Sequence, residues 1–427
     1  MAFLKKAILI NGSALVCFVI RMAQTVLLSR WLGPALIGQY ALVTSVVMLG
    51  AQVCALGLPI AFLYHSQHDP KRAQSYQTNC IWAGSLLGIV GGLAIGLLVW
   101  HGEGYFGAVP WYGCLAVGLY VLFMIHGGIT RNSLLRTVQA KRLSSMTLLS
   151  ALGAIGLVLL LAALGKLTVG TALVCFMTIQ MIRMAVGWFW VGPEVNFRIR
   201  PSMAVIKTLG CMGVRLGLVD VMVLLNGTVS VLIIKHLIRD FDSVGYFSRG
   251  MQVAMLVVTA SQAVLPLLFS KWASLSEEQL TPHFEKVMRF VTTFSLGVIL
   301  VILLFAKWAI LILYGPEYLP AVVPMMILLP GTVLVLLGKV IIQLLGSRGH
   351  PEVSTGALIF AAGVSAALSY LFVPSFGIRG AAAASTLGNL ALLLMLMGVV
   401  MRKFGVTLSH CLWLTPTDYR SLTRRKP

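Results

Sequence analysis

The chain has 427 residues, of which 59% are hydrophobic and only 10% are charged, and its mean hydropathy is +0.94. A soluble domain carries roughly 25% charged residues, so this composition excludes an ordinary soluble protein. The net charge of +20 would suggest nucleic-acid binding in a soluble chain. Apolar segments recur along almost the whole sequence, however, and they predict a polytopic helical membrane protein.

A transmembrane helix needs about 20 mostly apolar residues. The first apolar segment follows a basic N-terminus, as in a signal peptide, but it contains Arg21 and reaches Leu28 without a cleavage pattern. We therefore expect it to be retained as the first span. Breaks at charged, glycine and proline clusters divide the chain into twelve predicted spans of an all-α fold: 7–29, 37–63, 78–100, 109–130, 144–165, 168–191, 207–234, 244–270, 289–313, 320–346, 353–374 and 378–400.

Lysine and arginine residues in the short loops predict the orientation, because they concentrate on the cytoplasmic side. Of the 32 such residues, four lie inside spans, and 21 of the rest, among them Arg131, fall on the side of the N-terminus. This excess predicts that both termini are cytoplasmic. It also assigns most of the basic charge to topology and to anionic lipid headgroups, so no nucleic-acid partner is expected. The opposite side has seven: Arg30, Lys166, Lys235, Arg239, Arg249, Lys307 and Arg379.

Part of the sequence repeats. Gly38-Gln39-Tyr40 opens the second predicted span and Pro59 lies 21 residues after Gly38; Gly245-Tyr246-Phe247 opens the eighth and Pro266 lies 21 residues after Gly245. Parallel repeats of this kind occur in transporters built from two similar halves. The repeat predicts two six-helix lobes and a tail: an N-terminal lobe at 1–200, a C-terminal lobe at 201–400 and a basic cytoplasmic tail at 401–427.

Four cations lie inside predicted spans, and only one carboxylate, Asp220, lies inside a span to balance them. A charge in the hydrocarbon costs roughly 2.5–3.5 kcal/mol on insertion scales, so such residues face a water-filled cavity or a partner. An anionic substrate that enters the interior would complete the charge balance. The candidate substrate-binding residues are therefore Arg21, Arg183, Arg215 and Lys339.

The depths of these cations are consistent with a path that opens on the cytoplasmic side. At 1.5 Å per residue, Arg183, Arg215 and Lys339 lie ~12–14 Å from the inner ends of their spans. Arg21 lies ~20 Å from Lys6 by the same arithmetic. The alternative is that each side chain extends to the inner interface or pairs with carbonyl groups at a helix C-terminus. Extension to the interface is difficult for Arg21 because of its depth.

Asp220 follows Arg215 by five residues, so the two do not share a helix face. Two roles stay open for it: charge pairing with a cation on another span, or ion coupling as a proton carrier during transport.

Other chemistry finds little support in the sequence. The seven cysteines lie mostly inside spans and are typical of small apolar fillers. His65-Ser66-Gln67-His68-Asp69 contains metal-ligand residue types but no supporting Cys or Glu. A Walker motif for ATP is also absent. We expect no metal, no cofactor and no enzymatic activity.

Four local patterns are spread over nearly the whole chain. They are Leu32-Gly33-Pro34 followed by Gly38, Tyr40 and Leu56-Gly57-Leu58-Pro59; Leu313-Tyr314-Gly315-Pro316-Glu317-Tyr318; Gly346-Ser347-Arg348-Gly349-His350-Pro351; and Phe376-Gly377-Ile378-Arg379-Gly380-Ala381-Ala382. Together these patterns resemble the polysaccharide-transporter branch of the multidrug/oligosaccharidyl-lipid/polysaccharide exporter superfamily. In the second lobe, Arg239-Asp240-Phe241-Asp242 departs from the family pattern, since Leu-Gly-Pro stands at the corresponding place in the first lobe.

The resemblance implies a multidrug-and-toxin-extrusion-like fold and a flippase in the bacterial inner membrane. Such a protein moves undecaprenyl-pyrophosphate-linked oligosaccharides to the periplasmic leaflet by alternating access, for O-antigen, capsule or exopolysaccharide assembly. Arginine can bind the phosphate oxygens of that headgroup with two hydrogen bonds. The partners implied are the lipid-linked substrate, membrane lipids, and a polysaccharide polymerase or other assembly proteins.

Two alternative functions fit less well. A related ion-coupled exporter of small cationic drugs would need carboxylates in its cavity, yet the first six spans contain none. A membrane polymerase or ligase would need a sizeable outer loop for its catalytic groups, whereas the longest outer loops, 101–108 and 235–243, are short. The flippase is the leading interpretation.

Overall fold

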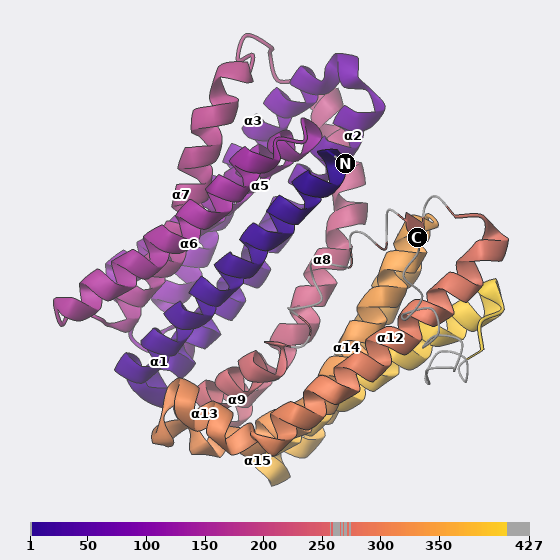
Figure 1. Cartoon of the computed structure of the whole chain (residues 1–427). Coiled ribbons are helices and arrows are strands. Elements are labelled where there is room, and N and C mark those ends of the chain that lie inside the picture. Colours follow the sequence, from indigo (N-terminus) through magenta and orange to yellow (C-terminus); the bar gives the residue numbers. More distant parts are fainter. Residues whose placement is uncertain are drawn as a thin grey trace. The chain divides into compact units, whose positions relative to one another are not determined.

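The computed structural model describes residues 2–407, apart from 257, 259–264, 266–267, 269–270 and 273–274; for 2–11 and 277 it describes only the backbone. Within these residues the chain consists of α-helices and short 3₁₀ turns and contains no strand (Figure 1). The all-α prediction is confirmed. Pro266 of the predicted repeat, and the part of the basic tail after 407, lie outside the described residues.

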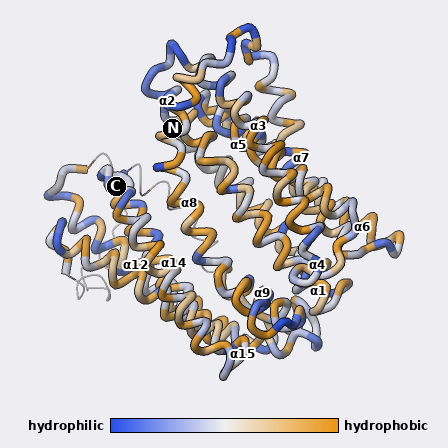
Figure 2. The backbone as a smooth tube through the Cα atoms, turned by 180° about the vertical axis from the view of Figure 1, so that it is seen from behind, coloured by the Kyte–Doolittle hydropathy of each residue, from blue (hydrophilic) through white to orange (hydrophobic). Residues whose placement is uncertain are grey.

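Nine helical stretches of the described chain are long and apolar enough to cross a membrane. Two of them, Gly12–His68 and Pro351–Phe404, each correspond to two predicted spans, because the backbone leaves the helical conformation at Gly33 and Gly377. Hydrophobic residues run along the helices, and hydrophilic ones gather near helix ends and connections (Figure 2). This pattern is typical of helices that cross a bilayer.

The chain divides into two compact units, Met1–Gly245 and Tyr246–Pro427. In the first, α5 packs against α3 and α7, while α1 packs against α6 and α8. Its helices are α1 (Ala2–Ala55), α2 (Leu58–His68), α3 (Ala73–His101), α4 (Glu103–Phe106), α5 (Trp111–Arg136), α6 (Ala140–Ala163), α7 (Val169–Val191) and α8 (Met203–Ile238), with 3₁₀ turns η1 (Pro70–Arg72) and η2 (Gly192–Glu194).

In the second unit, α14 packs against α15 over a long contact and also against α12. α9 (Phe241–Ala254) begins in the first unit and continues into the second. The described elements of the second unit are α12 (Glu277–Leu304), α13 (Ala306–Tyr314), η3 (Pro316–Ala321), α14 (Val322–Ser347) and α15 (Pro351–Phe404).

The first unit is longer than the predicted N-terminal lobe, because it includes α8. This helix packs against α1, α2 and α3, although the sequence repeat assigns it to the C-terminal lobe. The lobe boundary at 200/201 describes the repeat and stays a prediction; the boundary of the compact unit lies at Gly245.

The second predicted span is broken in its middle. Leu56 and Gly57 have φ values of 45° and 62°, and they separate α1 from α2. The break lies directly against α8: a Cβ atom added to Gly213 would lie 2.5 Å from the carbonyl oxygen of Leu56, and one added to Gly217 would lie 2.8 Å from the Cα of Gly57. Glycine at these positions lets the broken segment and α8 approach each other closely.

The segment Arg239-Asp240-Phe241-Asp242, which departs from the family pattern, also forms a break between two helices. Arg239 has a φ of 61°, which ends α8 as Gly33 ends the first half of α1. The Asp240 carboxylate then accepts hydrogen bonds from the backbone N–H groups of Asp242 (3.1 Å) and Ser243 (3.0 Å). These bonds satisfy N–H groups at the start of α9. The ammonium of Lys235 lies 3.4 Å from the centroid of the Phe241 ring.

Two alanine variants on α8 test the close contact with the helix break. Gly213→Ala should destabilise the protein by about 1–3 kcal/mol, because the added methyl group overpacks the contact with Leu56. Gly210→Ala is the matched control: no atom lies within 4 Å of its added Cβ, and replacing a helical glycine stabilises by roughly 0.5–1 kcal/mol. Thermal unfolding in detergent measures both, and equal effects of the two variants would contradict the predicted contact.

Candidate functional site

A cavity of about 260 Å³ lies inside the first unit. Its wall includes the break between α1 and α2, and the sides of α5, α7 and α8 that face this break. The non-helical backbone of this break therefore lines a cavity. Within a membrane, non-helical backbone is tolerated at such places because it does not contact lipid. The polar and charged side chains of the lining are Gln52, Arg131, Asn132, Gln180, Arg183 and Asp220.

Two cations of the cavity come from neighbouring helices. α5 and α7 approach closely at Gly127, whose added Cβ would lie 3.6 Å from the Cβ of Arg183. Arg131 is one helical turn further along α5 and has a solvent-accessible side chain, and it interacts electrostatically with Arg183. Asp220 of α8 lines the same cavity and interacts electrostatically with Arg131.

A third cation, Arg21 of α1, lies within electrostatic reach of Arg183. Its Nε and Nη2 atoms, and the Nε atom of Arg183, are buried and have no hydrogen-bond partner among the described residues. We call Arg21, Arg131 and Arg183 the arginine cluster. Because the cluster has three positive charges and the cavity beside it has one carboxylate, Asp220, the cluster carries uncompensated positive charge and unsatisfied donors. An anion with several oxygen atoms would satisfy both.

Hydrogen bonds and ring stacking fix the wall around the cluster. The Nδ2 atom of Asn132 donates to the carbonyl oxygen of Pro59 at 2.6 Å, which ties α5 to the first turn of α2. The Nε2 atom of Gln180 donates to the hydroxyl of Tyr120 at 3.4 Å. The Tyr120 ring stacks on Phe176, with centroids 4.4 Å apart. The first contact therefore joins α5 to α2, and the other two join α5 to α7.

The structure brings only some of the predicted site residues together. Arg21 and Arg183 share the arginine cluster. Arg215 lines a different pocket of the first unit, with His65 and Lys207. Lys339 belongs to α14 in the second unit. A single path along all four cations therefore stays a prediction, as do the two roles of Asp220.

Arg131 is the functional candidate that the sequence interpretation missed. The fourth span was predicted to end at 130, so Arg131 was assigned to an inner loop, but α5 continues to Arg136. The sequence spacing could have indicated this residue. Gly127, Gly128 and Arg131 follow Met124 by three, four and seven residues, which is the spacing of one helix face, and all four residues line the cavity.

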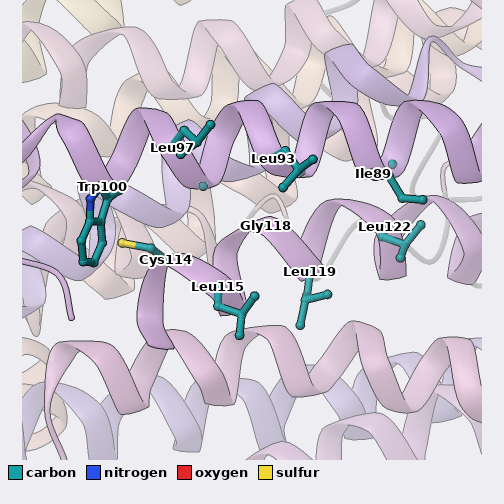
Figure 3. A pocket seen from close by; sticks show the side chains of 12 residues that line it. Ile89, Leu93, Leu97, Trp100, Cys114, Leu115, Gly118, Leu119 and Leu122 are labelled. Carbon is teal, nitrogen blue, oxygen red and sulfur yellow. The ribbon is translucent and has the colours of Figure 1, made fainter. Parts of the chain in front are cut away.

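Another pocket of the first unit, of about 340 Å³, cannot serve a charged ligand. It lies between α3 and α5, and its lining is apolar (Figure 3). Gly88, Gly92 and Gly118 lie at the contact of these helices, and an added Cβ at Gly88 would meet Leu122. Close helix packing explains this glycine series. Among the described residues, no group of three His, Cys, Asp or Glu side chains could hold a metal ion.

Comparison with known proteins identifies the family. The family described as polysaccharide biosynthesis protein matches residues 27–323, which is more than half of the chain. The chain belongs to this family. No curated protein sequence matches it.

The fold is similar to solved structures of the MOP superfamily. An inward-facing multidrug resistance MATE family transporter has a TM-score of 0.77 at 16% identity, with 93% of this chain and 98% of that chain covered. The lipid II flippase MurJ, in an inward closed conformation, has a TM-score of 0.77 at 13% identity, with 95% and 89% covered. A MOP superfamily transporter from Pyrococcus furiosus, described as having a binding pocket of reverse polarity, has a TM-score of 0.67 at 16% identity, with 94% and 97% covered. The predicted family and the multidrug-and-toxin-extrusion-like, all-α fold are confirmed.

A double-mutant cycle tests the electrostatic interaction between Arg131 and Asp220. Arg131→Gln alone leaves a carboxylate in the cavity without its cation, and Asp220→Asn alone increases the positive excess. The double variant should therefore be more stable than the sum of the single effects predicts, with a coupling energy of about 0.5–3 kcal/mol from thermal unfolding. Arg136→Gln combined with Asp220→Asn serves as the control and should be additive. Additivity in both cycles would contradict the interaction.

Proposed function

We propose that this protein is a flippase that moves undecaprenyl-pyrophosphate-linked oligosaccharides from the cytoplasmic to the periplasmic leaflet of a bacterial inner membrane. The translocated units would supply the assembly of O-antigen, capsule or exopolysaccharide. The observation that carries this proposal is the arginine cluster, three cations with one carboxylate inside a membrane-spanning unit. Membership in the polysaccharide biosynthesis family and the likeness in fold to a lipid II flippase support it.

The chemistry of the headgroup matches the cluster. A pyrophosphate that links a lipid to a sugar carries two negative charges and several acceptor oxygens, and each guanidinium can donate two parallel hydrogen bonds to it. Ligand pockets usually measure about 300–1,000 Å³, so a cavity of about 260 Å³ suits a headgroup better than a whole glycolipid. The sugar and the lipid chain would extend beyond it. In this proposal the protein binds and releases its substrate without changing its covalent bonds, and it acts with a polysaccharide polymerase or other assembly proteins.

Alternating access is the proposed mechanism. Transporters with parallel repeats expose a central site to the two sides of the membrane in turn, without a continuous channel. The substrate would enter from the cytoplasmic side, where Arg131, Arg183 and Arg215 lie nearest to the predicted inner ends of their helices. Both inward-facing and outward-facing structures exist for a MATE family transporter of similar fold.

An ion-coupled exporter of small molecules is the second candidate. It is favoured by the likeness in fold to multidrug resistance transporters and by the carboxylate of Asp220 in the cavity. Against a cationic drug stands the positive excess of the arginine cluster, which repels cations in a low-dielectric site. The two candidates therefore differ in the charge of the substrate.

Export of surface polysaccharide in a strain that lacks the native gene tests the proposed function. Arg131→Gln and Arg183→Gln should each lower export, because one lost charge contact is worth about 1.5–3 kcal/mol, or roughly ten- to hundred-fold in affinity. The lysine variants should keep more activity than the glutamine variants, since they retain the charge but lose the paired hydrogen bonds. The same order is expected for Arg21, Arg215 and Lys339.

Lys141→Gln is the control, because Lys141 is exposed at the start of α6. Export is normalised to the amount of protein in the inner membrane. Normal export by the glutamine variants of the arginine cluster would contradict an anionic substrate. Unchanged polysaccharide together with altered resistance to cationic drugs would favour the second candidate.

Reporter fusions test the proposed localisation and orientation. Fusions at Arg72, Lys141 and Arg198 should report the cytoplasm, and fusions at Gly104 and Glu317 should report the periplasm, because basic residues are concentrated in the first set of loops. The same side for Gly104 and Lys141 would show that the orientation of the third to fifth spans is wrong.

A further inference from the structure

The pocket that contains Arg215 is a second cationic site in the first unit. Its volume is about 480 Å³, and it lies where α2 meets the first half of α8. It shares no lining residue with the cavity of the arginine cluster. Its lining consists of His65, Ala204, Lys207, Thr208, Cys211, Met212 and Arg215.

The lining side chains have a regular arrangement. Lys207, Cys211 and Arg215 follow one another at intervals of four residues, which places them along one side of α8. His65 faces them from α2, and its ring stacks on Tyr76 (5.3 Å between centroids) and meets Tyr64 edge-on (5.4 Å). The Nε2 atom of His65 is buried and has no hydrogen-bond partner among the described residues. A ligand oxygen in the pocket could satisfy it.

The charges of this pocket all have the same sign. Its lining includes two cations, Lys207 and Arg215, and no Asp or Glu. Lys207 lies about 6 Å from the start of α8, where the helix N-terminus adds partial positive charge, whereas Arg215, about 18 Å from it, lies beyond that effect. Asp220, at the cavity of the arginine cluster, lies only about 8 Å further along the same helix than Arg215.

We propose that His65, Lys207 and Arg215 form a second anion site, which binds a phosphate or pyrophosphate group before it reaches the arginine cluster. This role as a loading site rests on the proposed function, whereas the binding of the anion does not. A compact ammonium and a guanidinium, placed two turns apart on one helix face, bind phosphate oxygens at two points. The imidazole adds a third point from α2. The ligand class is a phosphate monoester or diphosphate, either free or as the headgroup of a lipid.

Cys211 provides a native reporter inside this pocket. Its thiol is exposed, whereas Cys17, Cys80, Cys114 and Cys175 are buried. The purified full-length protein in phosphatidylcholine nanodiscs is treated with N-ethylmaleimide, and modification of the peptide that contains Cys211 is followed by mass spectrometry. This reagent is uncharged, so the removal of nearby cations does not change its attraction to the pocket. Inorganic pyrophosphate should slow the modification of Cys211, and sodium chloride at equal ionic strength should not.

Three variants decide the role of the lining residues. Lys207→Gln and Arg215→Gln should weaken the protection by pyrophosphate roughly ten- to hundred-fold in ligand concentration, as expected for a lost charge contact. Arg215→Lys should keep part of the protection, which separates lost charge from a folding defect. Lys71→Gln, an exposed cation of η1, is the matched control and should behave as the unaltered protein. Absence of protection by pyrophosphate and also by the two lipid ligands below, equal protection by chloride, or unchanged protection in both glutamine variants would overturn the proposal.

Two further ligands distinguish the source of the phosphate group. Nanodiscs that contain phosphatidic acid present a lipid phosphate monoester, and soluble farnesyl pyrophosphate presents an isoprenoid diphosphate. Protection of Cys211 by either ligand supports the site. Protection by these lipids without protection by free pyrophosphate would mean that the site binds a lipid headgroup. Protection by free pyrophosphate as well would mean that the phosphate group is sufficient for binding. The anion site can be tested separately from the proposed flippase function. Arg183→Gln should leave the protection of Cys211 unchanged even if this variant abolishes export.

Discussion

Electrostatic repulsion among arginines inside a membrane-spanning unit is the constraint on which this structure depends. Arg183 lies within electrostatic reach of both Arg21 and Arg131, and Arg131 interacts with Asp220, the carboxylate of the cavity. Charges of one sign repel strongly in a medium of low dielectric constant, and unpaired buried guanidinium groups are costly. Such a cluster lowers stability unless something binds it, which is why we interpret it as part of the proposed substrate site.

The break in the second span is what makes room for this cluster. At Leu56 and Gly57 the helix stops and restarts, and the side chain of Asn132 binds the carbonyl oxygen of Pro59. A continuous helix would fill this space with side chains and leave no backbone facing the cavity. Three glycines, Gly57, Gly213 and Gly217, then allow α8 to close against the break. The same contact brings Asp220 to the cavity and Arg215 to the neighbouring pocket.

The first unit therefore holds two cationic sites along one helix. α8 contributes Lys207 and Arg215 to one and Asp220 to the other, and α2 borders both, with His65 at one end and Pro59 at the other. An anion that left the first site would meet the second within a few helical turns. The Asp220 carboxylate, which interacts with Arg131, would compete with such an anion for this arginine. Carboxylate and phosphate oxygens accept hydrogen bonds from the same guanidinium N–H groups.

The fold class and most of the spans can be predicted from the sequence, because hydropathy and helix length respond to the bilayer independently of tertiary contacts. The sequence also identified Arg21 and Arg183, since any charge inside an apolar segment is visible in the sequence. Only the tertiary structure shows that Arg183 interacts with both Arg21 and Arg131, that Asp220 lines the cavity of Arg131 and Arg183, and that Arg215 belongs to another pocket. These arrangements depend on how far α5 extends and on which face of α8 packs against the helix break through Gly213 and Gly217. Both are set by packing between segments far apart in the chain, which local hydropathy does not encode.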